Sequence, residues 1–82
     1  MTIKEFKVQY VLGMISLDDK INIARTTTSK RILAILSRDE NNYVRRNVAG
    51  NKNTSTEVLV ALSKDGNYDI RYYVAYNKNN LL

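Results

Sequence analysis

The side chains that could do chemistry in this chain are carboxylates, arginines, lysines and tyrosines, because the sequence contains no histidine and no cysteine. Without histidine it lacks the usual general base near neutral pH and the commonest metal ligand. Without cysteine it has no disulfide, thiolate nucleophile or thiolate metal site. The adjacent carboxylates of Asp18 and Asp19 could form an acid and base pair, but we interpret them as the polar turn after a first helix, one of them acting as a helix cap.

Glycine-dependent phosphate sites are also missing from the sequence. The three glycines (Gly13, Gly50 and Gly66) are isolated, so they form no phosphate-binding loop. We therefore expect no enzyme activity, no catalytic residues, no cofactor and no metal site.

Three tyrosines near the C-terminal end are candidates for binding. Tyr72 and Tyr76 are four residues apart, and Tyr73 and Tyr76 are three apart, so on a helix they would share one face. Tyrosine gives a large contact area at a small entropic cost and is favoured in protein recognition. The alternative is that one or two of these tyrosines close the end of the hydrophobic core.

The net charge of +5 lies in the middle of the chain. Between Arg25 and Lys52 basic residues outnumber acidic ones, whereas the rest of the chain is balanced. Such a basic segment can track nucleic-acid phosphates while tyrosines stack on bases. The candidate phosphate-binding residues are Lys30, Arg31, Arg45, Arg46 and Lys52. Some of these arginines are expected to pair with Asp39 or Glu40, so nucleic-acid binding is the alternative to protein binding.

An internal repeat of 26 residues organises these side chains. The matching residues are Leu33 and Leu59, Leu36 and Leu62, Ser37 and Ser63, Asp39 and Asp65, Asn41 and Asn67, Arg45 and Arg71, Val48 and Val74, Ala49 and Ala75, and Asn51-Lys52-Asn53 and Asn77-Lys78-Asn79. An earlier, degenerate copy is indicated by Asn22-Ile23-Ala24, which matches Asn47-Val48-Ala49 at an offset of 25 residues.

The first half of each copy has the pattern of an amphipathic helix. Val58, Leu59 and Leu62 recur three and four residues apart, as the apolar face of a helix requires. Thr54 and Glu57 have the Thr-x-x-Glu spacing of a capping box, which would begin this helix.

The second half of each copy predicts another short helix. Val44 and Val48 are four residues apart, and Ala49 lies beside them. Asn51 and Asn77 follow the two second helices, where a residue in the left-handed conformation commonly ends a helix.

The pattern Leu59-x-x-Leu62-x-x-Asp65-x-x-x-x-Ile70-Arg71-x-x-Val74-Ala75-x-Asn77, with its partner from Leu33 to Asn51, resembles the leucine-rich repeat variant family and, more loosely, HEAT repeats. The resemblance implies paired helices stacked in a right-handed superhelical rod that acts as an interaction scaffold. Where the family usually carries proline, this chain has Lys52 and Ser55.

The predicted fold is therefore all-α, a short right-handed α-solenoid with an N-terminal cap helix and about two and a half two-helix repeats. We divide the single domain into a cap (1–19), a degenerate half repeat (20–27), two repeats (28–53 and 54–79) and a tail (80–82).

Matched charges and unmatched side chains suggest different roles. Asp39 and Arg45, like their counterparts in the next copy, keep a six-residue spacing, which we interpret as a ladder of ion pairs between repeats rather than a basic recognition element. Positions that differ between the copies are free of stacking constraints and are better candidates for binding. These positions are Arg46 and Tyr72, Asn47 and Tyr73, and Gly50 and Tyr76.

The expected function is non-catalytic protein binding through the second-helix face, as a small adaptor, inhibitor or regulator. The candidate partner-binding residues are Arg46, Asn47, Tyr72, Tyr73 and Tyr76. Leu81 and Leu82, at the open end of the stack, are expected to meet a partner or a second copy, which would make a homo-oligomer. No apolar run is long enough to enter a membrane, so we expect a soluble, cytoplasmic protein.

Overall fold

The computed structural model describes residues 1–80 of the chain. Within this range there are six α-helices and no strand, which confirms the predicted all-α class. The helices are α1 (Ile3–Val11), α2 (Leu17–Thr26), α3 (Lys30–Leu36), α4 (Asn42–Gly50), α5 (Thr56–Leu62) and α6 (Tyr68–Tyr76). None of these helices in residues 1–80 has the length and apolar character needed to cross a membrane.

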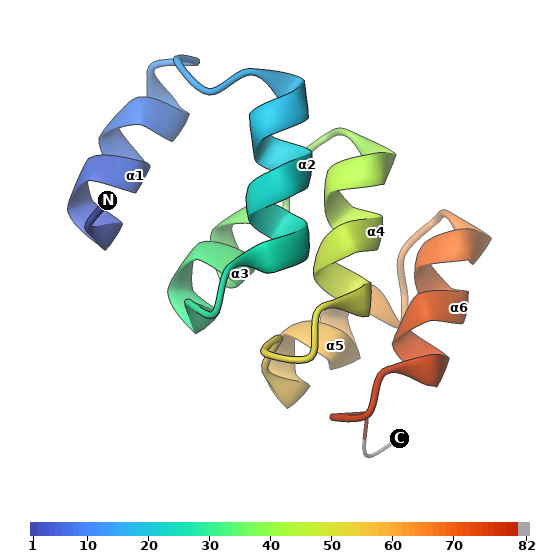
Figure 1. The fold of residues 1–82 in the computed structure, drawn as a ribbon. Helices are drawn as coiled ribbons and strands as arrows, with labels where there is room; N and C mark the ends of the chain where they lie inside the picture. The colour runs from blue at the N-terminus through green and yellow to red at the C-terminus, as the bar shows by residue number, and fades with distance from the viewer. Residues whose placement is uncertain (81–82) are drawn as a thin grey trace.

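The helices form two layers of unequal length (Figure 1). The longer α2, α4 and α6 stand side by side, with α4 between its two neighbours. The shorter α3 contacts α2 and α4, α5 contacts α4 and α6, and α1 packs against α3. The molecule measures 33 × 20 × 17 Å.

The sequence repeat corresponds to a repeat of helix pairs. Both ends of α3 and α5, and both ends of α4 and α6, are separated by the same 26 residues. The helix N-caps follow the same offset, with Ser29 and Ser55 before the first helices and Asn41 and Asn67 before the second. Local hydrogen bonds that begin each helix are thus repeated along with its apolar residues.

The degenerate N-terminal part is built differently from these pairs. The expected cap over 1–19 contains α1 and also the first residues of α2, so its boundary falls inside a helix. The segment 20–27 lies mainly in α2, which packs beside α4 as α4 packs beside α6.

The core is one continuous cluster between the layers. Its buried members come from both layers, and they include leucines of α3 and α5 and valines of α4 and α6. The buried apolar residues are Phe6, Ala24, Ile32, Leu33, Leu36, Val44, Val48, Ala49, Leu59, Leu62, Ile70 and Val74. Each fully buried leucine or valine stabilises the fold by about 1.5–3 kcal/mol, so this cluster is the main source of stability.

Two predicted caps are wrong, because neighbouring residues take the capping role. α5 begins after Ser55, whose Oγ accepts the Val58 N–H at 3.3 Å, and not at Thr54. Thr54 is buried and its hydroxyl instead donates to the carbonyl oxygen of Val48 at 2.6 Å.

The N-terminal helices are also capped by residues other than those predicted. A capping box does form, but at Thr2 and Glu5, where it begins α1. α2 is capped by Ser16 and not by an aspartate, because the Ser16 Oγ accepts the N–H of Asp19. Asp18 and Asp19 therefore lie in the first turn of α2.

The predicted left-handed conformation of Asn51 and Asn77 is also wrong. Their φ angles are −77° and −70°, and among residues 1–80 no residue other than Gly13 has a positive φ. Both asparagines are buried, and their side-chain amides donate hydrogen bonds to carbonyl oxygens of the preceding second helix and its loop. Their repeated spacing serves contacts between helices, and each side-chain oxygen also accepts the N–H two residues further on, which holds the turn after the helix.

Candidate functional site

Exposed tyrosines are concentrated on α4 and α6. Of the six tyrosines, all within the described range, five are exposed. They are Tyr43, Tyr68, Tyr72, Tyr73 and Tyr76. The core residues of α6 are Ile70 and Val74, so the three tyrosines at 72, 73 and 76 do not close the end of the core.

These rings and Arg46 form one connected surface. The ring centroids of Tyr72 and Tyr76 are 4.6 Å apart, and those of Tyr72 and Tyr73 are 5.8 Å apart with an edge-to-face arrangement. The Arg46 guanidinium carbon lies 4.9 Å from the centroid of the Tyr43 ring and 5.8 Å from that of Tyr73. We call Tyr43, Arg46, Tyr72, Tyr73 and Tyr76 the tyrosine–arginine surface.

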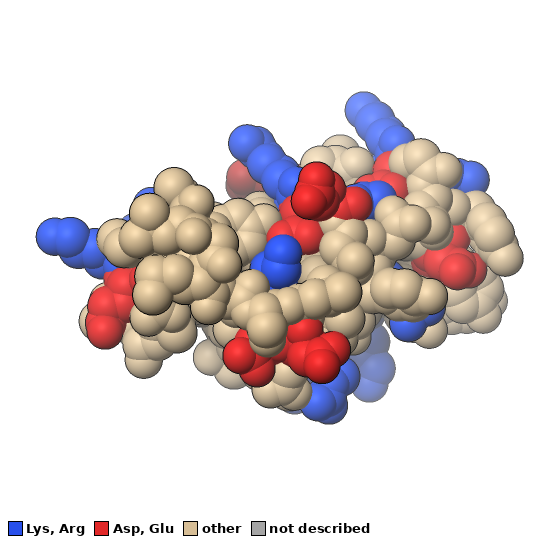
Figure 2. All heavy atoms as spheres, turned by 90° about the horizontal axis from the view of Figure 1, so that it is seen from above, with Lys and Arg blue, Asp and Glu red and all other residues tan. Residues whose placement is uncertain are grey.

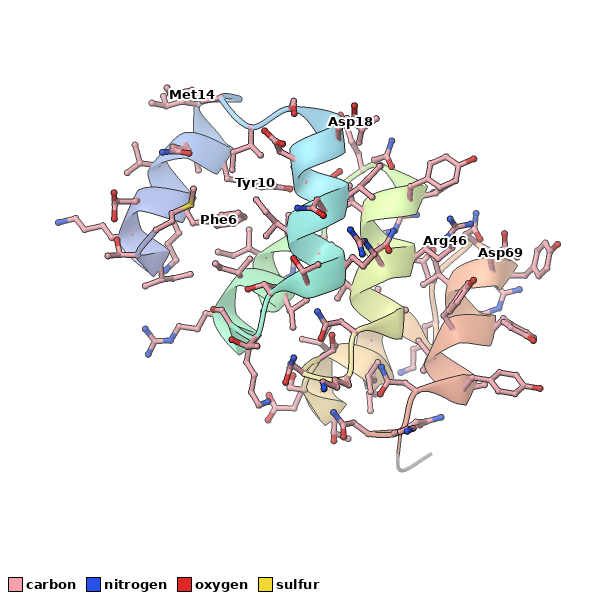
Figure 3. The ribbon with its side chains drawn as sticks, in the orientation of Figure 1. Phe6, Tyr10, Met14, Asp18, Arg46 and Asp69 are labelled. Atoms are coloured by element: carbon pink, nitrogen blue, oxygen red, sulfur yellow. The ribbon has the colours of Figure 1, made fainter. Side chains whose placement is uncertain are left out.

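The surface is held together by interactions of rings with each other and with a cation. Figure 3 shows Arg46 between α4 and α6, on the side of the molecule that carries Asp69 at the start of α6. The charge and hydrogen bond of Tyr76 raise the pKa of the Tyr72 phenol above its ordinary value, so the Tyr72 hydroxyl is neutral near pH 7.

Asn47 lies at the edge of this surface. Its Nδ2 donates to the Tyr43 carbonyl oxygen at 2.7 Å, which ties the amide to its own helix. The structure thus brings together Arg46, Tyr72, Tyr73 and Tyr76, four of the five predicted partner-binding residues, with Asn47 beside them.

A hollow of about 210 Å³ opens beside Arg46. It is lined by Arg25, Arg46, Asn47, Gly50 and Tyr73, which come from α2, α4 and α6. The sequence reasoning did not select Arg25. Extending the 25-residue match of Asn22-Ile23-Ala24 by one position aligns Arg25 with Gly50, and through it with Tyr76, which would have identified it as a variable position on the same face.

The charges at the loops before the second helices are engaged in interactions between copies. Arg45 forms an ion pair with Asp65 of the next copy, with 2.8 Å from Nε to Oδ2, and its Nη1 donates to the Asp39 carbonyl oxygen at 2.8 Å. Asp39 instead forms its ion pair with Lys20, at 3.0 Å. A ladder between copies therefore exists, but the predicted pairing of the Asp39 carboxylate with Arg45 is wrong because the guanidinium meets the Asp39 backbone.

Of the two carboxylates in these ion pairs, that of Asp39 is the more buried. The Tyr10 hydroxyl donates to the Asp39 carboxylate at 2.7 Å, and Figure 3 shows Tyr10 reaching from α1 toward α2. Burial, and then this hydrogen bond, raise the pKa of Tyr10 far above its ordinary value. Burial alone would raise the pKa of Asp39, but hydrogen bonds from Tyr10, the Asn41 N–H and Lys20 together lower it.

The second rung has the same electrostatic balance. Burial alone would raise the pKa of Asp65, yet the hydrogen bond from Arg45, the Asn67 N–H and the charges of Arg45 and Arg71 lower it. Both carboxylates are thus ionised near neutral pH, and both are engaged in contacts within the fold.

The candidate phosphate-binding residues lie in different environments. The Lys30 ammonium donates to the Asn53 carbonyl oxygen at 3.1 Å, Arg31 is exposed on α3, and Lys52 is exposed in the loop after α4. Arg45 is held by Asp65, whereas Arg46 lies over tyrosine rings. Seen from above the loops that precede α2, α4 and α6, acidic and basic side chains alternate and no continuous basic surface covers this view (Figure 2).

A larger groove, of about 760 Å³, lies on the other layer between α1, α3 and α5. Its apolar lining includes Ala34, Ile35, Val58 and Ala61. The sequence pattern did not reveal it, because a groove depends on how separate helices pack and not on the spacing of residues along one helix.

Within residues 1–80 no group of three or more acidic side chains is placed to hold a metal ion. The expected contact through Leu81 and Leu82 lies outside the described residues. No protein-family model, no curated protein and no solved structure matches this chain.

Proposed function

We propose that this chain is a short right-handed α-solenoid that binds another protein through the tyrosine–arginine surface and catalyses no reaction. The observation that carries the proposal is the connected cluster of exposed rings around Arg46 on α4 and α6. Tyrosine and arginine are the residues most enriched among those that dominate protein–protein binding energy.

The proposed solenoid is supported by the repetition of structure along the chain. Helix bounds, caps and buried asparagines recur every 26 residues, and α2, α4 and α6 pack in sequence order. The main contacts between helices in residues 1–80 are within a pair or between neighbouring pairs, as in helical repeat proteins. The resemblance to the leucine-rich repeat variant family is consistent with this stacking.

The proposed lack of catalysis is supported by where the shifted pKa values occur. Groups with perturbed pKa values are active-site candidates when they lie in a cleft, but ion pairs that hold a fold together shift pKa values in the same way. Here Asp39, Asp65 and Tyr10 are each held by hydrogen bonds or ion pairs that join helices. Their shifts are explained by structural contacts.

The proposal is tested by capture of a partner on the immobilised protein. The wild-type chain is incubated with native cell extract, with and without nuclease, and retained proteins are identified by mass spectrometry. We expect a defined protein that persists after nuclease treatment. Replacing Tyr72 and Tyr76 together by alanine is expected to weaken its binding by about 1,000-fold if the two losses add, since such residues each contribute about 2 kcal/mol, or about 30-fold.

The matched control is Tyr68→Ala. Tyr68 is equally exposed on the same helix, and in the described part of the chain it makes no ring contact with the cluster. This variant should retain capture, and all variants should keep the helical circular dichroism of the wild type. Capture that survives loss of Tyr72 and Tyr76 would refute the chosen surface, and capture lost with nuclease would favour nucleic-acid binding.

A further inference from the structure

We propose that the hollow between α2, α4 and α6 is a carboxylate-binding site, which takes an aspartate or glutamate side chain from an acidic segment of the partner protein. This inference rests on the proposed function, because it specifies the chemistry of the partner that meets the tyrosine–arginine surface.

The hollow is positively charged. Arg25 and Arg46 reach it from adjacent helices, and no acidic residue lines it. Within residues 1–80 the ion pairs are Lys20 with Asp39 and Arg45 with Asp65, so neither Arg25 nor Arg46 is neutralised by contact with a carboxylate. Two unneutralised guanidinium groups facing one space favour an anion there.

Both arginines are already held in place by contacts within the protein. Arg46 lies over the rings of Tyr43 and Tyr73, and Nη2 of Arg25 donates to the Asn22 side-chain oxygen at 2.7 Å. A guanidinium has five N–H donors, so each arginine keeps donors for a ligand. The planar arrangement of these donors matches the two oxygens of a carboxylate.

The size of the hollow selects the ligand. Sites for free small molecules usually measure about 300–1,000 Å³. The hollow measures about 210 Å³, the volume of about seven water molecules. It has room for the end of a single acidic side chain, while the exposed Tyr72 and Tyr76 beside it can contact the rest of the partner.

Gly50 keeps one wall of the hollow open. A Cβ atom at this position would lie 3.5 Å from Cδ1 of Tyr73, which is an ordinary contact. Alanine is therefore compatible with the structure, whereas a leucine side chain would extend into the hollow. Comparing the two substitutions distinguishes the effect of filling the hollow from the effect of merely losing glycine at this position.

Asp69 modulates the site without occupying it. It lines a smaller neighbouring hollow of about 130 Å³ that also contains Arg46. No ion pair joins the two side chains within the described residues. Its negative charge lowers the attraction of Arg46 for an anion, so Asp69→Asn should strengthen binding.

The test is a titration of the ¹⁵N-labelled chain, followed by NMR, with the capped peptide Gly-Glu-Glu-Glu-Gly. The neutral probe of the same shape is Gly-Gln-Gln-Gln-Gly. At millimolar peptide and low salt we expect the glutamate peptide to shift the side-chain Nε–H signals of Arg25 and Arg46 and the amide signal of Gly50, with little effect of the glutamine peptide.

Variants locate the binding. Arg25→Gln and Arg46→Gln should each weaken the peptide by about tenfold, as loss of a charge-assisted hydrogen-bond donor pair predicts. Gly50→Leu should abolish the shifts, and Gly50→Ala should retain them. The matched control is Arg31→Gln, which removes the same charge from an exposed position on α3 that does not line the hollow. It should change affinity by less than about twofold, because an exposed charge without direct contact contributes little.

Several outcomes would overturn the inference. Absence of shifts at the hollow, or an Arg31→Gln effect equal to that of Arg46→Gln, would show that no specific carboxylate site exists. Tighter binding of a short thymidine oligonucleotide at the same salt, dependent on Arg25 and Arg46, would assign the site to nucleic-acid phosphates. If the peptide fails but partner capture still requires Tyr72 and Tyr76, the inference is wrong and the proposed function stands.

Discussion

Replacing Asn51 by alanine tests the buried contact that joins α4 to α2. Asn51 is only 5% exposed. Its Nδ2 donates to the carbonyl oxygens of Ala24 and Thr27, each at 2.9 Å, and its Oδ1 accepts the Asn53 N–H at 2.7 Å. These three short bonds, together with a longer one of 3.4 Å to the Arg25 carbonyl oxygen, join one side chain to two separate backbone segments.

The expected loss of stability follows from these three bonds. A net hydrogen bond contributes about 0.5–1.5 kcal/mol, and a buried group left without a partner costs about 1–3 kcal/mol. For Asn51→Ala we expect a loss of about 3 kcal/mol, because water can reach some of the freed groups after truncation. A domain of this length has a free energy of unfolding of about 4–12 kcal/mol, so the variant loses a quarter of it or more.

The measurement is urea unfolding followed by circular dichroism at 222 nm. For a small domain the urea dependence is about 1 kcal/mol per molar, so the midpoint should fall by about 3 M, or the variant should be partly unfolded without urea. Asn53→Ala is the matched control, since Asn53 contributes only its backbone N–H and carbonyl to these contacts. The reasoning is refuted if Asn51→Ala lies within about 0.5 kcal/mol of the wild type, or if Asn53→Ala is equally destabilising.

Three further experiments test the charges and caps. The pKa of Asp39 is held below 3.8 despite burial. The stabilisation of the fold by ionised Asp39 is therefore complete above the unfolded-state pKa and is lost as the pH falls through the lower native-state pKa. Urea midpoints below about pH 4 should fall more steeply for the wild type than for Asp39→Asn. At pH 7 Asp39→Asn should unfold about 2–4 kcal/mol more easily, and equal stability would contradict the role of the ion pair. A double-mutant cycle with Arg45→Ala and Asp65→Ala should give a coupling of about 1–2 kcal/mol by urea unfolding, and a value near zero would remove this rung from the ladder. Thr54→Val should lower stability by about 1–2 kcal/mol by the same measurement, while Glu57→Ala changes stability by less than about 0.5 kcal/mol. A larger loss for Glu57→Ala than for Thr54→Val would instead support a capping box formed by Thr54 and Glu57.

The helices and the core were predictable because they follow from local periodicity. Leu33 and Leu36, and Leu59 and Leu62, have helical spacing and all four are buried. The 26-residue match transferred each helix assignment from one copy to the next. Repetition thus strengthened a pattern that is short in either copy alone.

The choice between adjacent capping residues was not predictable from local rules. Thr54 and Ser55 both have the side-chain oxygen that an N-cap requires. The choice is decided by Val48, whose carbonyl oxygen near the end of α4 accepts a hydrogen bond from the Thr54 hydroxyl. A contact across the turn therefore overrides the Thr-x-x-Glu spacing.

The ion-pair partners were likewise set by the stack and not by spacing along the chain. Asp39 and Arg45 are close in sequence, yet the guanidinium binds the backbone of Asp39 while its charge is neutralised by Asp65. The same geometry recurs where Arg71 donates to the Asp65 carbonyl oxygen at 2.6 Å. Only the arrangement of neighbouring copies determines which carboxylate faces which arginine.

The polar side chains of this protein divide into two sets with different physical roles. Residues that match between copies, such as Asn51, Asn77 and Asp65, are bonded to a neighbouring copy, so replacing them breaks the contacts that hold the helices together. Residues that differ, such as Arg46 and Tyr72, lie on the α4 and α6 surface and make few contacts with the core. Because the two sets do not share partners, substitutions in them should be nearly additive, and the proposed recognition surface can change without loss of the fold.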